Sequence, residues 1–380
     1  MPNASYFSRT YTEARQKFTG ICSKQAQFQC DFTLPHARGP SGEPLAIDVA
    51  RFGPEDADTI LLCVSGTHGA EGFPGSAVQS AWLEANRDFL SLGLPQGVAL
   101  WFVHAVNPFG FAWMYRNNEN NVDLNRNWID FGQALPDARD FADIYELATP
   151  ATMDPAARAQ RLADFYRLVE LRGEPWLEST LSRGQYDYAD APGFGGCEPQ
   201  FSRLALTALV HSHMREAKRV AYVDLHSGTP GPGELIFLCF AEPGSAAFQR
   251  AASWWGADKL DADNVDRQWG GKRPERNGLM YWGLERAFGE AVDFAGAVVE
   301  FGTVDVGDRV TVLESLLIEH YLRFRADYRA AESRPWIEAM RRCFDRTGDR
   351  VWEKQVLERG RAAIDAALRG TIAWRTEISA

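Results

Sequence analysis

The stretch SGTHGAEG, from Ser65 to Gly72, decides the expected fold and the expected site of this chain. It directly follows the apolar run TILLCV and places His68 and Glu71 three residues apart on a glycine-rich turn. If a helical turn starts there, this spacing brings an imidazole and a carboxylate to one point. Two candidate metal ligands therefore follow a buried strand, and other segments must supply a third ligand and a catalytic base.

The bulk composition bounds the class of protein. The chain has 380 residues, 45% of them hydrophobic, which suffices for one large α/β domain or two smaller ones. Its net charge of −11 argues against a nucleic-acid surface. The first residues lack a secretory pattern, and no run approaches the ~20 apolar residues of a membrane span. We expect a cytoplasmic protein that binds neither nucleic acid nor membrane, of undetermined oligomeric state.

Two residue types contribute less to the expected function. The six cysteines are scattered without CxxC pairs, so no disulfide is expected, and Cys63 and Cys239 lie in apolar runs typical of a core. A basic cluster at Lys272, Arg273 and Arg276 is expected in a solvated loop that could steer an acidic substrate.

Apolar runs of strand length recur along the chain and alternate with helical patterns. Besides TILLCV they cover residues 98–108, 219–228, 234–240 and 295–303. Leu45, Ile47 and Val49 instead alternate with smaller or polar residues, which predicts a half-buried strand. Short continuous apolar runs are typical of strands covered on both faces. The alternation predicts an α/β fold with a mixed, mostly parallel central sheet and helices on both faces.

Helical patterns dominate two longer blocks. Residues 131–218 are mostly helical in pattern, apart from the loop GQYDYADAPGFGG, and such an insertion could wall a cleft. Residues from about 311 to 370 are largely amphipathic helix. Because no internal repeat or linker divides the chain, a single catalytic domain over residues 1–380 is the simplest interpretation.

Three side chains suited to catalysis each lie at the end of an apolar run. They are His68, His226 and Glu300. In α/β sheets, functional groups gather beyond the carboxyl ends of strands. Two histidines and a carboxylate form the ligand set of a hydrolytic zinc site, where zinc lowers the pKa of water toward ~7. A further carboxylate must take the water proton, and Glu300 is the candidate, because a carboxylate in a buried strand is costly unless it has a task.

Taken together, the motifs resemble the zinc carboxypeptidase family. HxxE at His68 and Glu71, NPFGF from Asn107, NVDLNRNW at 121–128, DLHSG at 224–228 and VVEFGT around Glu300 occur in that family's order. The chain looks most similar to a bacterial branch described only as a domain of unknown function, which shares GFGGCEP and long C-terminal helices. The metal and base motifs span residues 60–305.

The resemblance implies a role for each residue that matches a catalytic motif. His68, Glu71 and His226 would bind one zinc ion. Glu300 would be the general base and acid, and Arg116 would stabilise the tetrahedral oxyanion together with the metal.

The same resemblance implies residues that orient and bind. Asp123 would hold the first histidine in its tautomer. Asn125 and Arg126 match the pair that clamps a terminal carboxylate, because a planar guanidinium gives a bidentate fit. Tyr281, in GLMYWG, is the nearest candidate by position for the tyrosine that closes over the substrate.

Each candidate also has a structural interpretation. By themselves, His68 and Glu71 would more often form a satisfied polar turn. Glu300 could pair with an arginine, and Arg126 could neutralise a carboxylate. His104, in an apolar strand, is expected to be a hydrogen-bonded core residue.

The expected function is zinc-dependent cleavage of an amide bond next to a free carboxylate, as in a peptide, by metal-activated water with a Glu base. The same site could instead act on an N-acyl amino acid or another small amide, as in deacylase relatives of this fold. A small pocket closed by residues 131–218 would favour that alternative. A non-catalytic binding module ranks lower, because His68, Glu71, His226 and Glu300 are all present.

Overall fold

The computed structural model describes residues 6–260, 275–304 and 309–377 of the chain. Lys272 and Arg273 of the basic cluster lie outside these described residues. Within them, no helix is both long enough and apolar enough to cross a membrane. All six cysteines are free thiols in the described structure.

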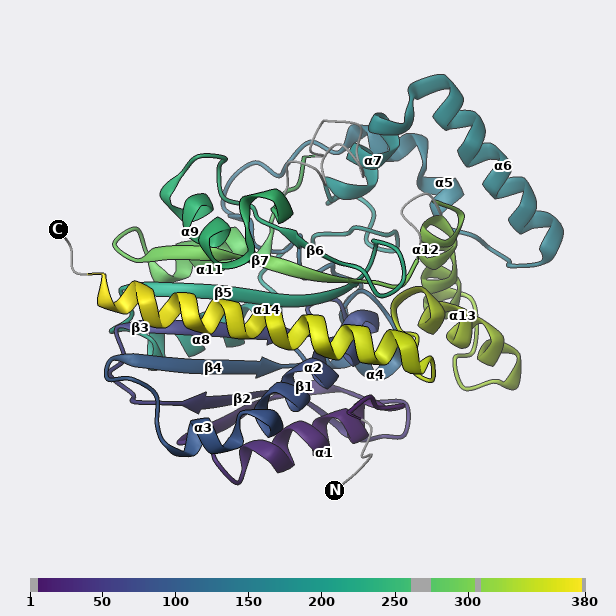
Figure 1. Cartoon of the computed structure of the whole chain (residues 1–380). Helices are drawn as coiled ribbons and strands as arrows, with labels where there is room; N and C mark the ends of the chain where they lie inside the picture. The colour runs from purple at the N-terminus through teal and green to yellow at the C-terminus, as the bar shows by residue number, and fades with distance from the viewer. Residues whose placement is uncertain (1–5, 261–274, 305–308, 378–380) are drawn as a thin grey trace.

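One seven-stranded sheet forms the centre of the described structure (Figure 1). Its strands are β1 (Phe28–Arg38), β2 (Pro44–Phe52), β3 (Thr59–Ser65), β4 (Val98–His104), β5 (Arg219–Gly228), β6 (Leu235–Leu238) and β7 (Asp293–Gly302). In space they follow the order β1-β2-β4-β3-β5-β7-β6. The four strands β4, β3, β5 and β7 pair in parallel, whereas β1, β2 and β6 join with antiparallel pairing. The expected mixed α/β sheet is confirmed, with its parallel part in the middle.

The central strands are buried because helices cover both faces of the sheet. Every residue of β3 and β4 is buried, which explains their continuous apolar sequences. One face packs against α1 (Tyr11–Cys22), α2 (Gly72–Ala85), α9 (Ala246–Trp255) and α14 (Arg350–Thr376). The other face packs against α8 (Phe201–His213) and α11 (Met280–Phe288).

A third group of helices lies beyond the carboxyl ends of the parallel strands (Figure 1). It comprises α4 (Pro108–Trp113), α5 (Tyr145–Ala148), α6 (Pro155–Arg172), α7 (Glu174–Ser182), α12 (Arg309–Phe324) and α13 (Arg334–Phe344), which share an apolar cluster. The short elements are α3 (Arg87–Ser91), η1 (Gly69–Glu71), η2 (Arg139–Asp143), η3 (Ala257–Lys259) and η4 (Ala331–Ser333). The helical block before β5 thus serves two purposes: α8 covers the sheet, while α5, α6 and α7 stand over its end.

The turn after β3 follows from its glycines. Gly66 has φ +69°, in the left-handed region that glycine adopts without strain. The chain then enters η1 and continues directly into α2, so the expected helical turn is present. Gly69 has a different role, because a Cβ there would lie 2.0 Å from the carbonyl carbon of Gly110. The backbone of η1 therefore packs directly on α4.

We predict that Gly69→Ala lowers the free energy of unfolding by about 1–3 kcal/mol. The added methyl group overlaps the backbone of Gly110 and Phe111, which cannot move without shifting α4. Gly20→Ala is the matched control, since a Cβ at this exposed position in α1 meets no atom within 4 Å. The control should stabilise by about 0.5–1 kcal/mol. Urea unfolding of both variants measures the difference, and equal stabilities would contradict the assigned close approach.

Candidate metal centre

Three buried side chains converge at the carboxyl end of β3 and β5. Ligand atoms of His68, Glu71 and His226 all lie within 4.8 Å of one another. His68 and Glu71 come from the turn after β3, and His226 comes from β5, which pairs with β3 in parallel up to Ser65 and Leu225. Parallel pairing therefore brings together residues that are more than 150 positions apart in the chain.

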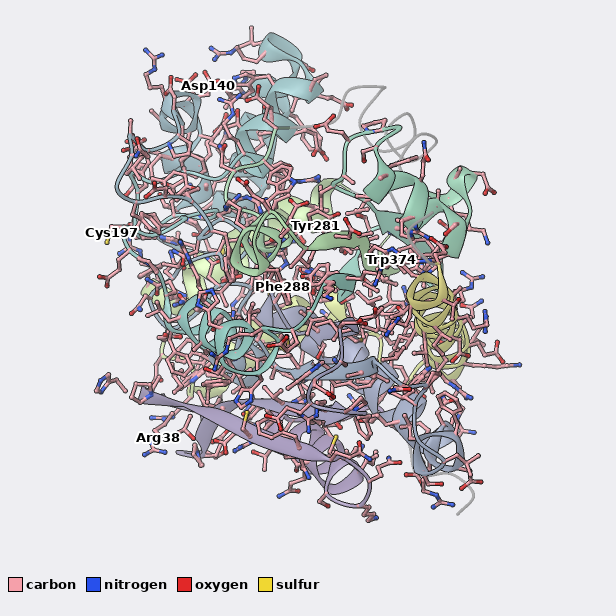
Figure 2. All side chains as sticks on the ribbon, turned by 90° about the vertical axis from the view of Figure 1, so that its left-hand side faces the viewer. Arg38, Asp140, Cys197, Tyr281, Phe288 and Trp374 are labelled. Carbon is pink, nitrogen blue, oxygen red and sulfur yellow. The ribbon has the colours of Figure 1, made fainter. Side chains whose placement is uncertain are left out.

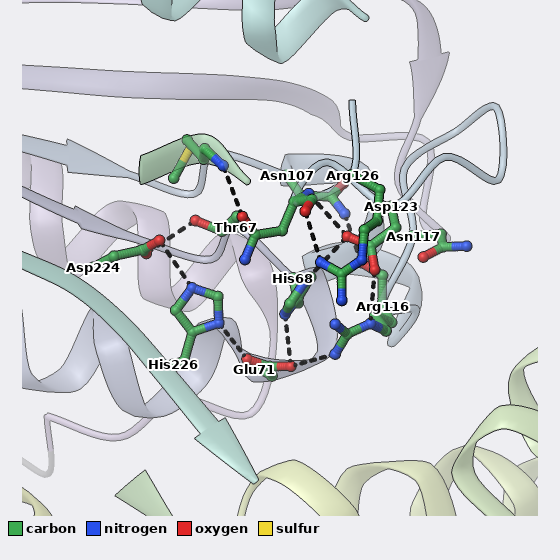
Figure 3. A network of polar contacts seen from close by, with 12 residues as sticks. Thr67, His68, Glu71, Asn107, Arg116, Asn117, Asp123, Arg126, Asp224 and His226 are labelled. Carbon is green, nitrogen blue, oxygen red and sulfur yellow. Dashed lines mark hydrogen bonds and ion pairs between the residues drawn. The ribbon is translucent and has the colours of Figure 1, made fainter. Parts of the chain in front are cut away.

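The Glu71 carboxylate lies between the two imidazole rings (Figure 3). Its Oε1 is 2.9 Å from Nδ1 of His68, and its Oε2 is 2.8 Å from Nδ1 of His226. Burial alone would raise the pKa of Glu71, but the neighbouring His68 and His226 hold it below its ordinary value. Burial would lower the pKa of His226, but Asp224 and Glu71 raise it well above the ordinary value. A bound cation would displace protons from this cluster.

Each histidine has a second carboxylate on its far nitrogen. Nε2 of His68 is 3.2 Å from Oδ1 of Asp123. Nε2 of His226 is 2.9 Å from Oδ2 of Asp224, although the angle of this contact is not that of an aligned hydrogen bond. These carboxylates leave Nδ1 of both rings facing Glu71, and such partners fix ring orientation in metal sites.

No role was predicted for Asp224, which lies on β5 two residues before His226. Side chains two apart on a strand share a face, and Tyr222 lies on that face as well. The Tyr222 hydroxyl donates to Oδ2 of Asp224, and Thr67 donates to Oδ1, each at 3.0 Å. The alternation Tyr, Asp, His in a strand was the signal that could have identified this carboxylate.

Arg116 joins the two halves of the site. Its Nη1 donates to Oε1 of Glu71 at 3.0 Å, and its Nε donates to Oδ2 of Asp123 at 3.2 Å. Burial alone would raise the pKa of Asp123, but the positive charge of Arg116 beside it holds this pKa well below its ordinary value. The Arg116 side chain is about one quarter exposed, so it also faces the pocket.

The loop that carries Arg116 is held by Glu319 of α12, a residue that no sequence motif indicated. Its two carboxylate oxygens accept from the backbone N–H groups of Arg116 at 2.8 Å and Asn117 at 2.9 Å. Burial raises the pKa of Glu319. The contact joins residues about 200 positions apart, so only the folded chain reveals it.

Asn125 and Arg126 lie beside the cluster and line the same pocket. Oδ1 of Asn125 accepts from the backbone N–H of Met280 at 2.8 Å. Arg126 is buried, and its Nη1 donates to the Asn125 carbonyl at 2.6 Å, whereas its Nε has no hydrogen-bond partner in the described part of the chain. No described carboxylate forms an ion pair with Arg126. The alternative that Arg126 only neutralises a buried acid is therefore not observed among the described residues.

Glu300 lies on β7, directly opposite His226 in the parallel pairing with β5. Its side chain is partly buried and lines the pocket, and no described residue hydrogen-bonds to its carboxyl group. Burial, and then the charge of Glu71, raise the pKa of Glu300 to about 8. The alternative of a buried ion pair with an arginine is not observed within the described ranges.

Tyr281 is the one sequence-predicted site residue that the structure does not bring to the pocket. It lies in α11 (Figure 2). Its side chain is 2% exposed and packs against Tyr222, Phe240 and Phe294. Its hydroxyl has no hydrogen-bond partner among residues 6–260, 275–304 and 309–377. By contrast His104 is the expected core residue, since its Nε2 contacts Oγ of Ser76 at 2.9 Å.

The cluster opens into a pocket of about 330 Å³. The polar residues that line it include all the candidate site residues except Tyr281, namely His68, Glu71, Arg116, Asp123, Asn125, Arg126, His226 and Glu300. Residues of α6, α7 and α12 and the end of α13 form a further part of its walls. The pocket therefore places potential metal ligands, an unpaired carboxyl group and an unpaired arginine within one space.

A family model with the description "Protein of unknown function (DUF2817)" matches residues 7–359. This confirms the resemblance to a branch described as a domain of unknown function. No curated protein matches the chain.

Solved structures similar to the chain include metallocarboxypeptidases. Bovine thrombin-activatable fibrinolysis inhibitor, in complex with tick carboxypeptidase inhibitor, is 11% identical, with a TM-score of 0.45 over 96% of this chain and 99% of that one. Carboxypeptidase A from Helicoverpa armigera is 11% identical, with a TM-score of 0.44 over 97% and 75%. A putative succinylglutamate desuccinylase/aspartoacylase from Shewanella frigidimarina is 16% identical, with a TM-score of 0.32 over 79% and 72%.

We predict that the metal-free protein loses stability as pH rises from about 5 to 9, in part through Glu300. Its folded pKa of about 8 lies above the unfolded value of 4.5. The stabilising contribution is therefore fully present below pH 4.5 and is lost as pH rises through 8. Glu300→Gln removes this titration.

The measurement is urea unfolding of the chelator-treated wild type and of Glu300→Gln at several pH values between 5 and 9. The free energy of unfolding of the variant should rise relative to the wild type across this range. Parallel pH profiles for the two proteins would contradict the raised pKa.

Proposed function

The chain belongs to the DUF2817 family, and we propose that it is a zinc-dependent hydrolase that cleaves an amide bond next to a free carboxylate. In this reaction the amide C–N bond breaks, a water oxygen adds to the carbonyl carbon, and a proton passes to the leaving nitrogen. The products are a carboxylic acid and an amine that bears the free carboxylate.

One observation carries the proposal. Glu300, whose carboxyl group no described residue hydrogen-bonds, and the buried Arg126, which forms no ion pair with a described residue, line the same pocket as the three candidate ligands. A buried guanidinium is costly without an anion, and an unpartnered carboxyl on an inner strand is costly without a task. Arg126 is suited to bind a substrate carboxylate, and Glu300 is suited to transfer a proton.

The donor atoms suit zinc. Two imidazole nitrogens and a carboxylate oxygen, from His68, His226 and Glu71, converge within 4.8 Å, and both rings are backed by carboxylates. Three such ligands with an open position are typical of hydrolytic zinc sites. A zinc ion held there would polarise the amide carbonyl and lower the pKa of water.

The residues of the chain divide the remaining work. Glu300 takes a proton from water and delivers it to the leaving nitrogen, which requires its ionised form, and a nearby cation favours that form. Arg116, held against the cluster by Glu71 and Asp123, donates to the developing oxyanion. Arg126 and the Asn125 amide hold the substrate carboxylate.

The pocket favours a second version of this reaction, deacylation of an N-acyl amino acid or another small amide. Helices α6, α7 and α12 wall the pocket, and its volume of about 330 Å³ lies at the small end for ligand sites. This shape suits a small amide better than a long peptide. Parallel assays of free-acid peptides, amidated peptides and N-acyl amino acids separate the two versions.

We predict that Glu300→Gln keeps bound zinc but lowers kcat by about 10²–10⁴-fold, because it removes the proton acceptor without removing a ligand. Metal content and turnover are measured on the same preparation. A loss of zinc in this variant would instead make Glu300 a ligand or a structural residue. If the wild type binds no metal even after zinc reconstitution, a non-catalytic binding module becomes the better description.

We predict that Arg126→Ala raises KM for carboxylate substrates by about 10–100-fold, since a charge-assisted hydrogen bond is worth about 1.5–3 kcal/mol. The KM for the matching amidated substrates should change far less. Arg139→Ala, at an exposed arginine of η2, is the control and should leave both values unchanged. Equal effects of Arg126→Ala on free-acid and amidated substrates would remove the clamp assignment.

A further inference from the structure

Helices α6, α7 and α12 line one side of the pocket mainly with apolar side chains. These include Tyr166 and Val169 of α6, Leu177 and Leu181 of α7, and Val312 and Leu316 of α12. Two of these side chains are well exposed, Tyr166 at 44% and Val312 at 40%. Apolar surface left open on a pocket wall becomes favourable binding area when a hydrocarbon group covers it.

The carboxylate end and the α12 end of the pocket are built from different segments. Arg126 lies beside Gly184, at the end of α7, and Gly278, before α11. The α12 end adjoins the close of α13, where the Phe344 carbonyl accepts from the Ser227 hydroxyl, next to His226. If Arg126 holds the substrate carboxylate, the acyl part of the substrate extends toward the α12 end.

The charges of the pocket distinguish a hydrocarbon acyl group from an acidic one. The residues with which α6 and α12 line the pocket carry no ionisable group other than the Tyr166 hydroxyl. On α7, Glu174 and Glu178 are acidic and are engaged with other groups. Arg276, the remaining cation of the lining, lies over the Phe240 ring at 5.5 Å and is also engaged. These walls thus favour a neutral acyl chain.

We infer that this pocket selects N-acyl amino acids whose acyl group is a hydrocarbon chain, which lies against α6, α7 and α12. The inference rests on the proposed hydrolytic function and narrows its substrate class. Hydrolysis of such a substrate gives a fatty acid and a free amino acid, with water supplying the hydroxyl to the acid and a proton to the amine.

The test is a series of N-acyl-L-leucines with acetyl, butanoyl, hexanoyl and octanoyl groups, together with N-succinyl-L-leucine, on the zinc-loaded protein. Burial of one methylene corresponds to about a two- to fourfold gain, so kcat/KM should rise at least about tenfold from acetyl to hexanoyl. A flat series, or a preference for the succinyl compound over hexanoyl, would overturn the inference.

Variants at the wall locate the effect. Val312→Glu places a carboxylate against the acyl chain and should remove the preference in kcat/KM for the hexanoyl over the acetyl compound. Val312→Leu should retain this preference. Leu171→Glu is the matched control, because this residue of α6 is 75% exposed and does not line the pocket. The control should leave both the ratio and the basal activity unchanged. If Val312→Glu and Leu171→Glu behave alike, the chain does not lie on this wall.

Calorimetry with the same compounds separates failure of this inference from failure of the proposed function. If no amide is cleaved, the proposed function fails, but tighter binding of the octanoyl than of the acetyl compound would still support the apolar wall. If acetyl-leucine is cleaved and neither binding nor kcat/KM increases with chain length, the hydrolase stands and the substrate class is overturned.

Discussion

The carboxylate of Glu71, held between two imidazole rings, is the contact on which the rest of the site depends. It exists because β3 and β5 pair in parallel, so that the turn after β3 and the end of β5 meet at one edge of the sheet. Gly66 adopts a left-handed backbone conformation, and Gly69 has no Cβ that would overlap α4, so this turn packs directly on α4. The fold thus supplies the site through strand pairing and one tight turn, without a long flexible loop.

This arrangement concentrates negative charge. Glu71, Asp123 and Asp224 are all buried within hydrogen-bonding distance of two histidines, and the guanidinium of Arg116 offsets only part of their charge. Buried carboxylates are stable only when paired. The metal-free cluster meets this demand with protons, as the raised pKa of His226 indicates. A divalent cation would meet the same demand without them, so charge balance and the donor set point to the same kind of occupant.

The elements that could be predicted from the sequence are those with a local sequence pattern. The continuous apolar runs identified β3, β4, β5 and β7, and the order of motifs brought together the residues that share the pocket. No strand was predicted for β1 at the sheet edge, although Phe28, Cys30 and Phe32 alternate with polar residues in a strand pattern. Glu319 could not be predicted, because its role depends on a contact across about 200 residues. Position in the chain suggested Tyr281, but packing on the sheet face keeps this residue away from the pocket.

One face of helix α12 both lines the pocket and holds the loop of Arg116. Val312, Leu316 and Glu319 follow the spacing i, i+4, i+7, so the residues that border the pocket and the carboxylate that holds the Arg116 loop lie along the same side. A shift or rotation of this helix to suit a new ligand would pull on that loop as well. During evolution, α6 and α7 could therefore shift to fit a new substrate. Helix α12 would have to keep its position and could change only the side chains that face the pocket.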